Sequence, residues 1–273
     1  MVRSTEDFRS LLKAARRAGT PLLAVRTADP ASAMAQVSAS LCSKTDVPVF
    51  AWDIMSGMAA RNKAAKDATA HVFGEKAAIA GPADALFALN KGAAVKQFAD
   101  AIVFFHNPQR MWEQIDIVQG IWNLRDVFKV GGQMLVLVTT PGSVLPLELQ
   151  NDVMVIDEPL PSADDLREII PGLFESAELA PPDEAVMDQA VDALVGLAAF
   201  PAEQALAMSL SKKGLDVERL WELEASGSRA GTRIDDLARR RNVRGHRRMR
   251  EHQALSFRSA QGSGISARHC VRR

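Results

Sequence analysis

The chain has 273 residues, and 33 lysines and arginines balance 33 aspartates and glutamates, so the formal net charge is zero. This length is enough for one or two domains. Cys42 and Cys270 lie far apart in the sequence, which excludes a disulfide framework and a cysteine zinc site. No apolar run approaches the roughly 18 residues of a membrane span, and the N-terminus lacks the apolar segment of a signal peptide. These features are typical of a cytoplasmic protein.

The zero net charge hides a strong asymmetry between the two parts of the chain. Residues 1–224 carry 20 lysines and arginines against 30 acids, whereas residues 225–273 carry 13 arginines, no lysine and three acids. Such an abrupt change in charge predicts a boundary near residue 224.

Short apolar runs alternate with helical patterns over residues 1–160. The runs are continuous and do not alternate with polar residues, which favours a parallel sheet covered on both faces. Residues 54–81 are poorly patterned, and we expect an exposed insertion there. The helix expected over 109–129 is amphipathic: Met111, Ile115, Val118 and Trp122 form one apolar stripe, and Ile121, Leu124 and Phe128 border it. The predicted strands are 21–26, 47–53, 101–105, 133–139 and 153–156, and the other predicted helices here are 4–19, 32–41 and 82–89.

Only helical patterns follow Pro161. Ser162 and Asp165 have the spacing of a capping box, and further helices are expected over 181–197, 202–211 and 215–223. The sequence therefore predicts a three-layer α/β domain over 1–160, a small helical domain over 161–223, and a disordered arginine-rich tail over 224–273.

Six short motifs carry a resemblance to a known family through their order and spacing. They are Pro21–Arg26, Val49–Asp53, Ala101–Asn107, Leu135–Gly142, Leu145–Leu149 and Asp157–Pro161. This arrangement resembles an AAA ATPase module and, more narrowly, the degenerate AAA-like N-terminal domain of tandem AAA ATPases of bacterial and plastid type. The resemblance covers about residues 1–223 and implies a P-loop-NTPase-like parallel sheet followed by a helical lid.

The chain departs from the family at most positions that handle nucleotide. A working module has a Gly- and Lys-containing phosphate loop after its first strand; here residues 27–33 contain neither, and Asp29 would repel phosphate. His106 and Asn107 replace the two acids of the Walker B position. Asn151 and Asp152 stand where an arginine finger is expected. Thr139 and Thr140 remain as sensor-like residues.

The resemblance implies ATP and Mg²⁺ as ligands and other AAA subunits, or an active AAA module, as partners. Hydrolysis depends on positioning and charge neutralisation of phosphate, and the residues that supply both are missing. We therefore expect no catalytic residue and no metal site, weak or absent nucleotide binding, and a regulatory or scaffold domain or a truncated fragment of a larger AAA ATPase.

The arginine-rich tail has two interpretations. It could bind nucleic acid, because the arginine side chain matches the geometry of phosphate. The alternative to an AAA domain is therefore an accessory protein that binds nucleic acid through this tail. It could instead be the product of a shifted reading frame or truncation, given its composition. The candidate nucleic-acid residues are Arg239, Arg240, Arg241, Arg244, Arg247, Arg248 and Arg250.

Several other polar or aromatic residues have an ordinary structural interpretation. His106 is expected to cap a strand where the loop meets water. Asp157 and Glu158 are adjacent, so their side chains point in different directions, and a solvated strand end is favoured over a catalytic pair. Trp112 and Trp122 are expected in the core.

Overall fold

The computed structural model describes residues 4–42, 47–74, 81–211 and 214–223. The chain divides into two compact units, Met1–Val217 and Glu218–Arg273. In the second unit the described residues, 218–223, are helical. All elements discussed below belong to the first unit.

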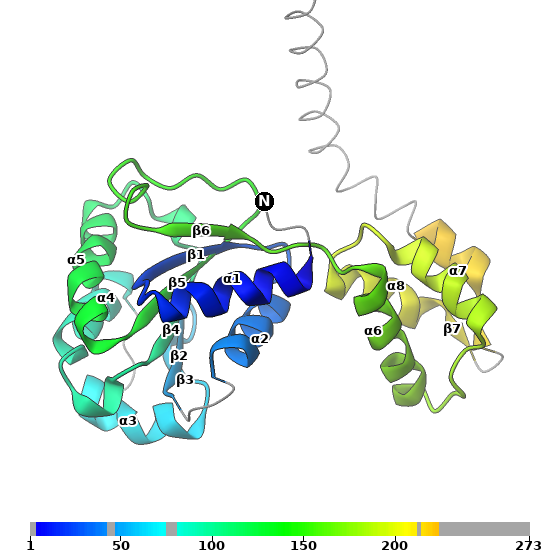
Figure 1. Ribbon diagram of the computed structural model, residues 1–273, viewed down its shortest axis with the longest axis horizontal. Coiled ribbons are helices and arrows are strands. Elements are labelled where there is room, and N and C mark those ends of the chain that lie inside the picture. The colour runs from blue at the N-terminus through cyan, green and yellow to red at the C-terminus, as the bar shows by residue number, and fades with distance from the viewer. Residues whose placement is uncertain (1–3, 43–46, 75–80, 212–213, 224–273) are drawn as a thin grey trace, which may run out of the picture. The chain divides into compact units, whose positions relative to one another are not determined.

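A six-stranded sheet forms the centre of the first unit (Figure 1). Its strand order is β3-β2-β4-β5-β1-β6, and every pair is parallel except β2 with β3. The mostly parallel sheet confirms the predicted fold class. The strands are β1 Leu22–Arg26, β2 Val49–Asp53, β3 Gly57–Ala60, β4 Ile102–His106, β5 Met134–Thr139 and β6 Met154–Asp157.

Helices cover both faces of this sheet (Figure 1). Side chains of successive strand residues point to opposite faces. Leu23 and Val25 therefore pack with α1 (Thr5–Arg17) and α2 (Pro30–Leu41), while Leu22 and Ala24 face the other core. That second core is formed with α3 (Lys63–Phe73), α4 (Pro82–Gly92) and α5 (Ile115–Gly131).

Short polar side chains determine where several helices begin. Ser4 accepts a hydrogen bond from the Asp7 amide at the start of α1, as the sequence predicts. Asn62 caps α3 in the same way. At the other end of α5, Gly132 has φ +70°, a left-handed conformation in which glycine ends a helix without steric strain.

The region 54–81 was predicted wrongly as an exposed insertion. It contains β3, which extends the sheet, and α3, which packs on it. Met58, Ala65 and Ala68 are buried there. The sequence signal was weak because alanine gives little contrast between a buried and an exposed helix face.

The predicted buried stripe of α5 was also wrong in part. Ile115 is 84% exposed and Trp122 is 39% exposed. The helix begins at Ile115 rather than near 109, because residues 108–110 form a separate 3-10 turn. The buried face consists of Ile117, Val118, Ile121, Leu124 and Phe128, so it contains Val118 of the predicted stripe and the three residues predicted to border it.

Three further helices follow β6 and pack on one another. They are α6 (Ala163–Ser176), α7 (Glu184–Leu194) and α8 (Ala199–Ser209), followed by a two-stranded hairpin of β7 (Leu210–Ser211) and β8 (Gly214–Leu215). The capping box predicted for Ser162 and Asp165 is present at the start of α6. We refer to α6–α8 as the helical bundle.

Candidate functional site

The ends of four neighbouring parallel strands bring the candidate residues to one edge of the sheet. In the strand register, Arg26 of β1 lies beside Thr139 of β5 and Asp157 of β6. His106 of β4 lies beside Val138. Because these strands run in one direction, the loops that follow them meet at this edge, where open α/β sheets place their ligand sites.

A side chain in the loop after β1 forms hydrogen bonds with the backbone amides at the N-terminus of α2. Asp29 Oδ1 accepts hydrogen bonds from the amides of Ala31 and Ser32, both at 3.1 Å. The amide of Asp29 donates in turn to Thr27 Oγ1 at 2.8 Å. Free amides at a helix N-terminus bind anions, and here a carboxylate already occupies two of them.

Glu158 lies beside this loop and is not the solvated strand end that was predicted. Thr27 donates a hydrogen bond to its Oε2, and Gln36 Nε2 donates to its Oε1 at 3.0 Å. Burial raises the pKa of the Glu158 carboxyl, and the negative charge of Asp29 raises it further. Asp29 and Glu158 together thus make this edge of the sheet acidic.

The neighbouring basic side chain is already paired. Arg26 Nε lies 2.6 Å from Asp157 Oδ1, and Arg26 also donates to the other oxygen of that carboxylate at 2.8 Å. Asp157 is exposed, as expected for a strand end. Its charge neutralises the guanidinium at the end of β1.

His106 ends β4 and is half-buried. Burial lowers the pKa of its imidazole, Asp53 at the end of β2 raises it, and Arg61 lowers it further. The net direction is downward, so the ring is neutral at physiological pH. An imidazole at this position therefore does not supply the negative charge that a carboxylate would.

Asn107 follows in a left-handed conformation with φ 54°. Its amide donates to Val138 O at 3.0 Å, and the 3-10 turn 108–110 begins directly after it. The predicted turn at Asn107 and Pro108 is therefore present. Asn107 accepts a hydrogen bond from Gln109, so its side chain belongs to this local turn.

The two threonines predicted to be sensor-like, Thr139 and Thr140, have different environments. Thr139 is buried, and its Oγ1 donates to Val25 O at 3.4 Å while its carbonyl accepts from the Thr27 amide at 2.9 Å. Thr140 is exposed. Thr139 therefore holds β1 and β5 together, and the sensor role of both residues stays a prediction.

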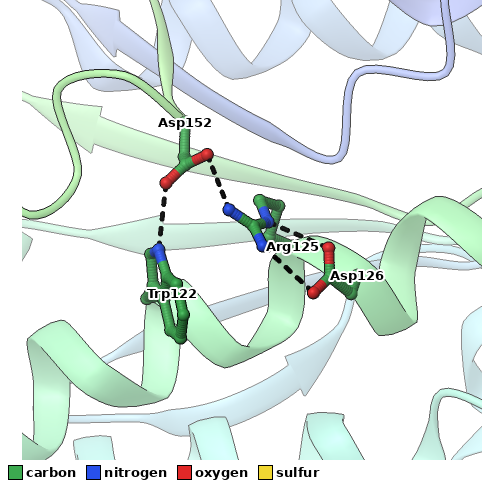
Figure 2. A network of polar contacts seen from close by, with 4 residues as sticks. All are labelled: Trp122, Arg125, Asp126 and Asp152. Carbon is green, nitrogen blue, oxygen red and sulfur yellow. Dashed lines mark hydrogen bonds and ion pairs between the residues drawn. The ribbon is translucent and has the colours of Figure 1, made fainter.

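Asp152, at the position expected for an arginine finger, binds groups on α5 (Figure 2). It accepts from Trp122 Nε1 and from Arg125 Nη1, both at 2.9 Å. Hydrogen bonding to Arg125 lowers the pKa of Asp152 against the opposing effect of burial, and the same guanidinium lowers the pKa of Asp126. The prediction that Trp122 is a core residue was wrong, because its indole nitrogen reaches outward to this carboxylate.

The seven candidate arginines of the tail, Arg239, Arg240, Arg241, Arg244, Arg247, Arg248 and Arg250, lie outside the described residues. Among the residues that the structure describes, no group of three or more acidic, histidine or cysteine side chains could hold a metal ion. No helix within the described ranges is long and apolar enough to span a membrane.

Asp29 was singled out from the sequence, but its role as the N-cap of α2 was not predicted. The helix was expected to begin near Ser32, whereas Asp29 caps it and α2 begins at Pro30. The Asp-Pro pair was the available signal, because aspartate favours the cap position and proline the first helical position. Glu158 and Thr27 are 131 positions apart, so the sequence around either residue does not predict their hydrogen bond.

Comparison with known proteins connects the chain to a family. Several solved structures resemble the chain. One belongs to the HORMA:CdnC:Trip13 complex of E. coli MS115-1, with 10% identity over 81% of this chain and 86% of that chain and a TM-score of 0.50. Domain III of the Thermotoga maritima replication initiation protein DnaA has 13% identity over 81% and 90%, with a TM-score of 0.49. The C. elegans protein PCH-2 has 9% identity over 84% and 69%, with a TM-score of 0.45.

At these identities the structural likeness concerns the fold alone. No curated protein matches the sequence. Residues 6–158, more than half of the chain, match the family described as SpoVK-like AAA ATPase, N-terminal domain. The resemblance predicted from the motifs is thereby confirmed, and the chain belongs to the SpoVK-like AAA ATPase family.

Proposed function

We propose that this chain is a non-hydrolysing AAA module that acts as a regulatory or scaffold domain beside active AAA modules. The observation that carries the proposal is the position of Asp29. Its carboxylate takes the α2 amides that, in a working phosphate loop, would face the nucleotide. A second anion at the same place would have to displace this carboxylate.

The charges around the site support the same conclusion. Glu158 lies beside Asp29, and the Arg26 guanidinium is held by Asp157. ATP carries several negative charges, and two carboxylates near its phosphates would raise the free energy of binding. Although the family implies ATP as a ligand, the residues present do not fit its phosphates, and we infer weak or absent binding.

The chemistry of phosphoryl transfer lacks its usual groups here. Mg²⁺ and the attacking water are commonly oriented by acidic or amide side chains near the phosphates. His106 is uncharged at neutral pH and Asn107 is engaged in its own turn. We assign no catalytic role and no Mg²⁺ site to either residue.

A module without turnover would contribute through contacts with other subunits. The related fold in the E. coli MS115-1 structure was solved as part of a complex with other proteins, which supports a role in assembly. We propose AAA subunits that retain a phosphate loop as the partners. Purification of the tagged full chain from its native cells is expected to recover such a subunit.

Phosphate release from MgATP by the purified full chain tests the absence of hydrolysis. We expect a rate equal to that of a blank without protein. Release that grows with protein concentration, and that changes when Thr139→Val is introduced, would show that this chain hydrolyses ATP and would overturn the proposal. The variant separates activity of the chain from a contaminating ATPase.

A further inference from the structure

The helical bundle shares little apolar packing with the sheet that precedes it. Two cores cover the faces of the sheet, and among the described residues neither core includes a side chain of α6, α7 or α8. The bundle instead has its own buried residues, among them Leu166, Ile170 and Leu206. Polar links between the bundle and the sheet therefore matter more for holding the two together.

One of these links is made by Asp29, which serves two helices at once. Its Oδ1 accepts from the Ala31 and Ser32 amides of α2, while its Oδ2 accepts from the Phe200 amide of α8 at 3.1 Å. Asp29 and Phe200 are 171 positions apart in the sequence. The two oxygens of one carboxylate thus join the loop after β1 to the first turn of α8.

The start of α8 lacks a cap of its own. Its N-cap residue is Ala198, whose side chain makes no capping hydrogen bond. The first amides of a helix need acceptors from outside the helix, and a negative charge there also interacts favourably with the helix dipole. Asp29 meets both needs from a distant part of the chain. By contrast, α7 is capped locally by Asp183, which accepts from the Val186 amide.

A second link of the same kind connects α1 to α6. Thr5 Oγ1 donates to Asp165 Oδ2 at 2.7 Å, and the same oxygen accepts from the Ser162 amide in the capping box of α6. Each link therefore uses an aspartate that caps a helix on its own side and accepts a hydrogen bond from the other side. Asp29 is the one that adds a missing cap.

We propose that Asp29 is a built-in anionic latch that holds the helical bundle against the loop after β1 without any bound nucleotide. Because the latch is part of the chain, it holds the bundle in the absence of any ligand. This inference concerns the contact between Asp29 and α8 in the nucleotide-free chain and does not depend on whether the chain hydrolyses ATP.

The variant Asp29→Ser distinguishes the hydrogen bond to α8 from the capping of α2. Serine is a good N-cap residue and keeps an acceptor for α2, but it has no second oxygen for the Phe200 amide. The matched control is Asp183→Ala, which removes a helix cap inside the bundle and leaves the latch intact. Asp29→Asn is a second variant of nearly identical shape with a single acceptor oxygen, so that poor folding of Asp29→Ser cannot decide the result.

Two measurements on the full chain report whether the contact between Asp29 and α8 persists in these variants. Hydrogen exchange reports the first turn of α8, where we expect exchange about tenfold faster in Asp29→Ser than in the wild type, the effect of one lost hydrogen bond. Electron paramagnetic resonance reports the distance between spin labels at Lys129→Cys and Asp192→Cys, with Cys42 and Cys270 replaced by serine. We expect a broader distance distribution in Asp29→Ser.

The control fixes how each outcome is interpreted. In Asp183→Ala we expect the distance distribution and the exchange of α8 to match the wild type, even though α7 is less stable. Exchange and distances in both Asp29 variants that equal those of the wild type would overturn the proposal. Equal broadening in Asp183→Ala and Asp29→Ser would also overturn it, because the effect would then come from general destabilisation of the bundle.

Discussion

The Thr27 hydroxyl donates a hydrogen bond to the Glu158 carboxylate and so joins the residue that follows β1 to the residue that follows β6. The same hydroxyl accepts from the Asp29 amide at 2.8 Å. Thr27 therefore lies between two acids, Asp29 and Glu158, in the loop after β1.

Glu158→Gln is expected to stabilise the fold at neutral pH. Burial and Asp29 raise the pKa of Glu158 above its ordinary value of 4.5. The stability that this group contributes is fully present below pH 4.5 and is lost as the pH rises through the raised pKa. The variant should therefore raise the free energy of unfolding at neutral pH. Thermal unfolding at pH 7.5 and near pH 4 checks this, since the gain should vanish in acid; a loss of stability at both pH values would contradict it.

His106 is expected to titrate below its ordinary value of 6.5, because burial disfavours the charged ring. Its neutral form therefore contributes stability above pH 6.5, and this contribution is lost as the pH falls through the lowered pKa. NMR titration of the imidazole measures the midpoint. Asp53→Asn should lower the midpoint further, because the Asp53 charge opposes the effect of burial. A midpoint above 6.5, or one that rises in the variant, would be inconsistent with the described environment.

Phe98→Ala is expected to destabilise the protein by about 3–5 kcal/mol, because it leaves a cavity in the core. Phe98 is fully buried, and its ring lies within 6.4 Å, centroid to centroid, of Phe50, Phe73 and Phe128. The matched control is Phe87→Ala on α4, whose side chain is 62% exposed and contacts Lys91. There we expect a loss below about 1 kcal/mol. Urea unfolding of both variants compares the two, and similar losses would argue against the described core.

Asp152→Asn is expected to lower the melting temperature slightly at neutral pH and to change the Trp122 fluorescence. The hydrogen bond from Arg125 lowers the pKa of Asp152, so its contribution to stability is present above the ordinary value of 3.8 and is lost as the pH falls through the lowered pKa. The difference from the wild type should therefore shrink in strong acid. Asp126→Asn, which contacts the same guanidinium from the adjacent position, serves as the control and should leave the indole emission unchanged.

The sequence was sufficient for the five parallel strands of the sheet and for several helix starts, but not for the edge strand β3. Continuous apolar runs such as Leu22–Val25 stand out between polar loops, and each was predicted within two residues of its observed bounds. Ser4 and Ser162 were recognised as caps because a capping side chain acts on amides only two or three positions away. Interactions between residues this close in the chain can be predicted from a single sequence.

The site was predictable only where its contacts are local. The absence of glycine and lysine after β1 indicated a missing phosphate loop, and Asp29 was expected to repel phosphate. The hydrogen bonds of Glu158 to Thr27 and Gln36, and that of Asp29 to Phe200, join residues 131, 122 and 171 positions apart. Such contacts depend on how the strands and the bundle come together, which one sequence does not reveal.

Isothermal titration of MgATP into the full chain tests the central claim most directly, because the claim is that the Asp29 carboxylate occupies the α2 amides that would otherwise bind phosphate. We predict no heat beyond dilution at millimolar nucleotide and no rise in melting temperature. Micromolar binding with a 1:1 stoichiometry would contradict the account, since it would mean that the phosphates find hydrogen-bond donors despite Asp29 and Glu158.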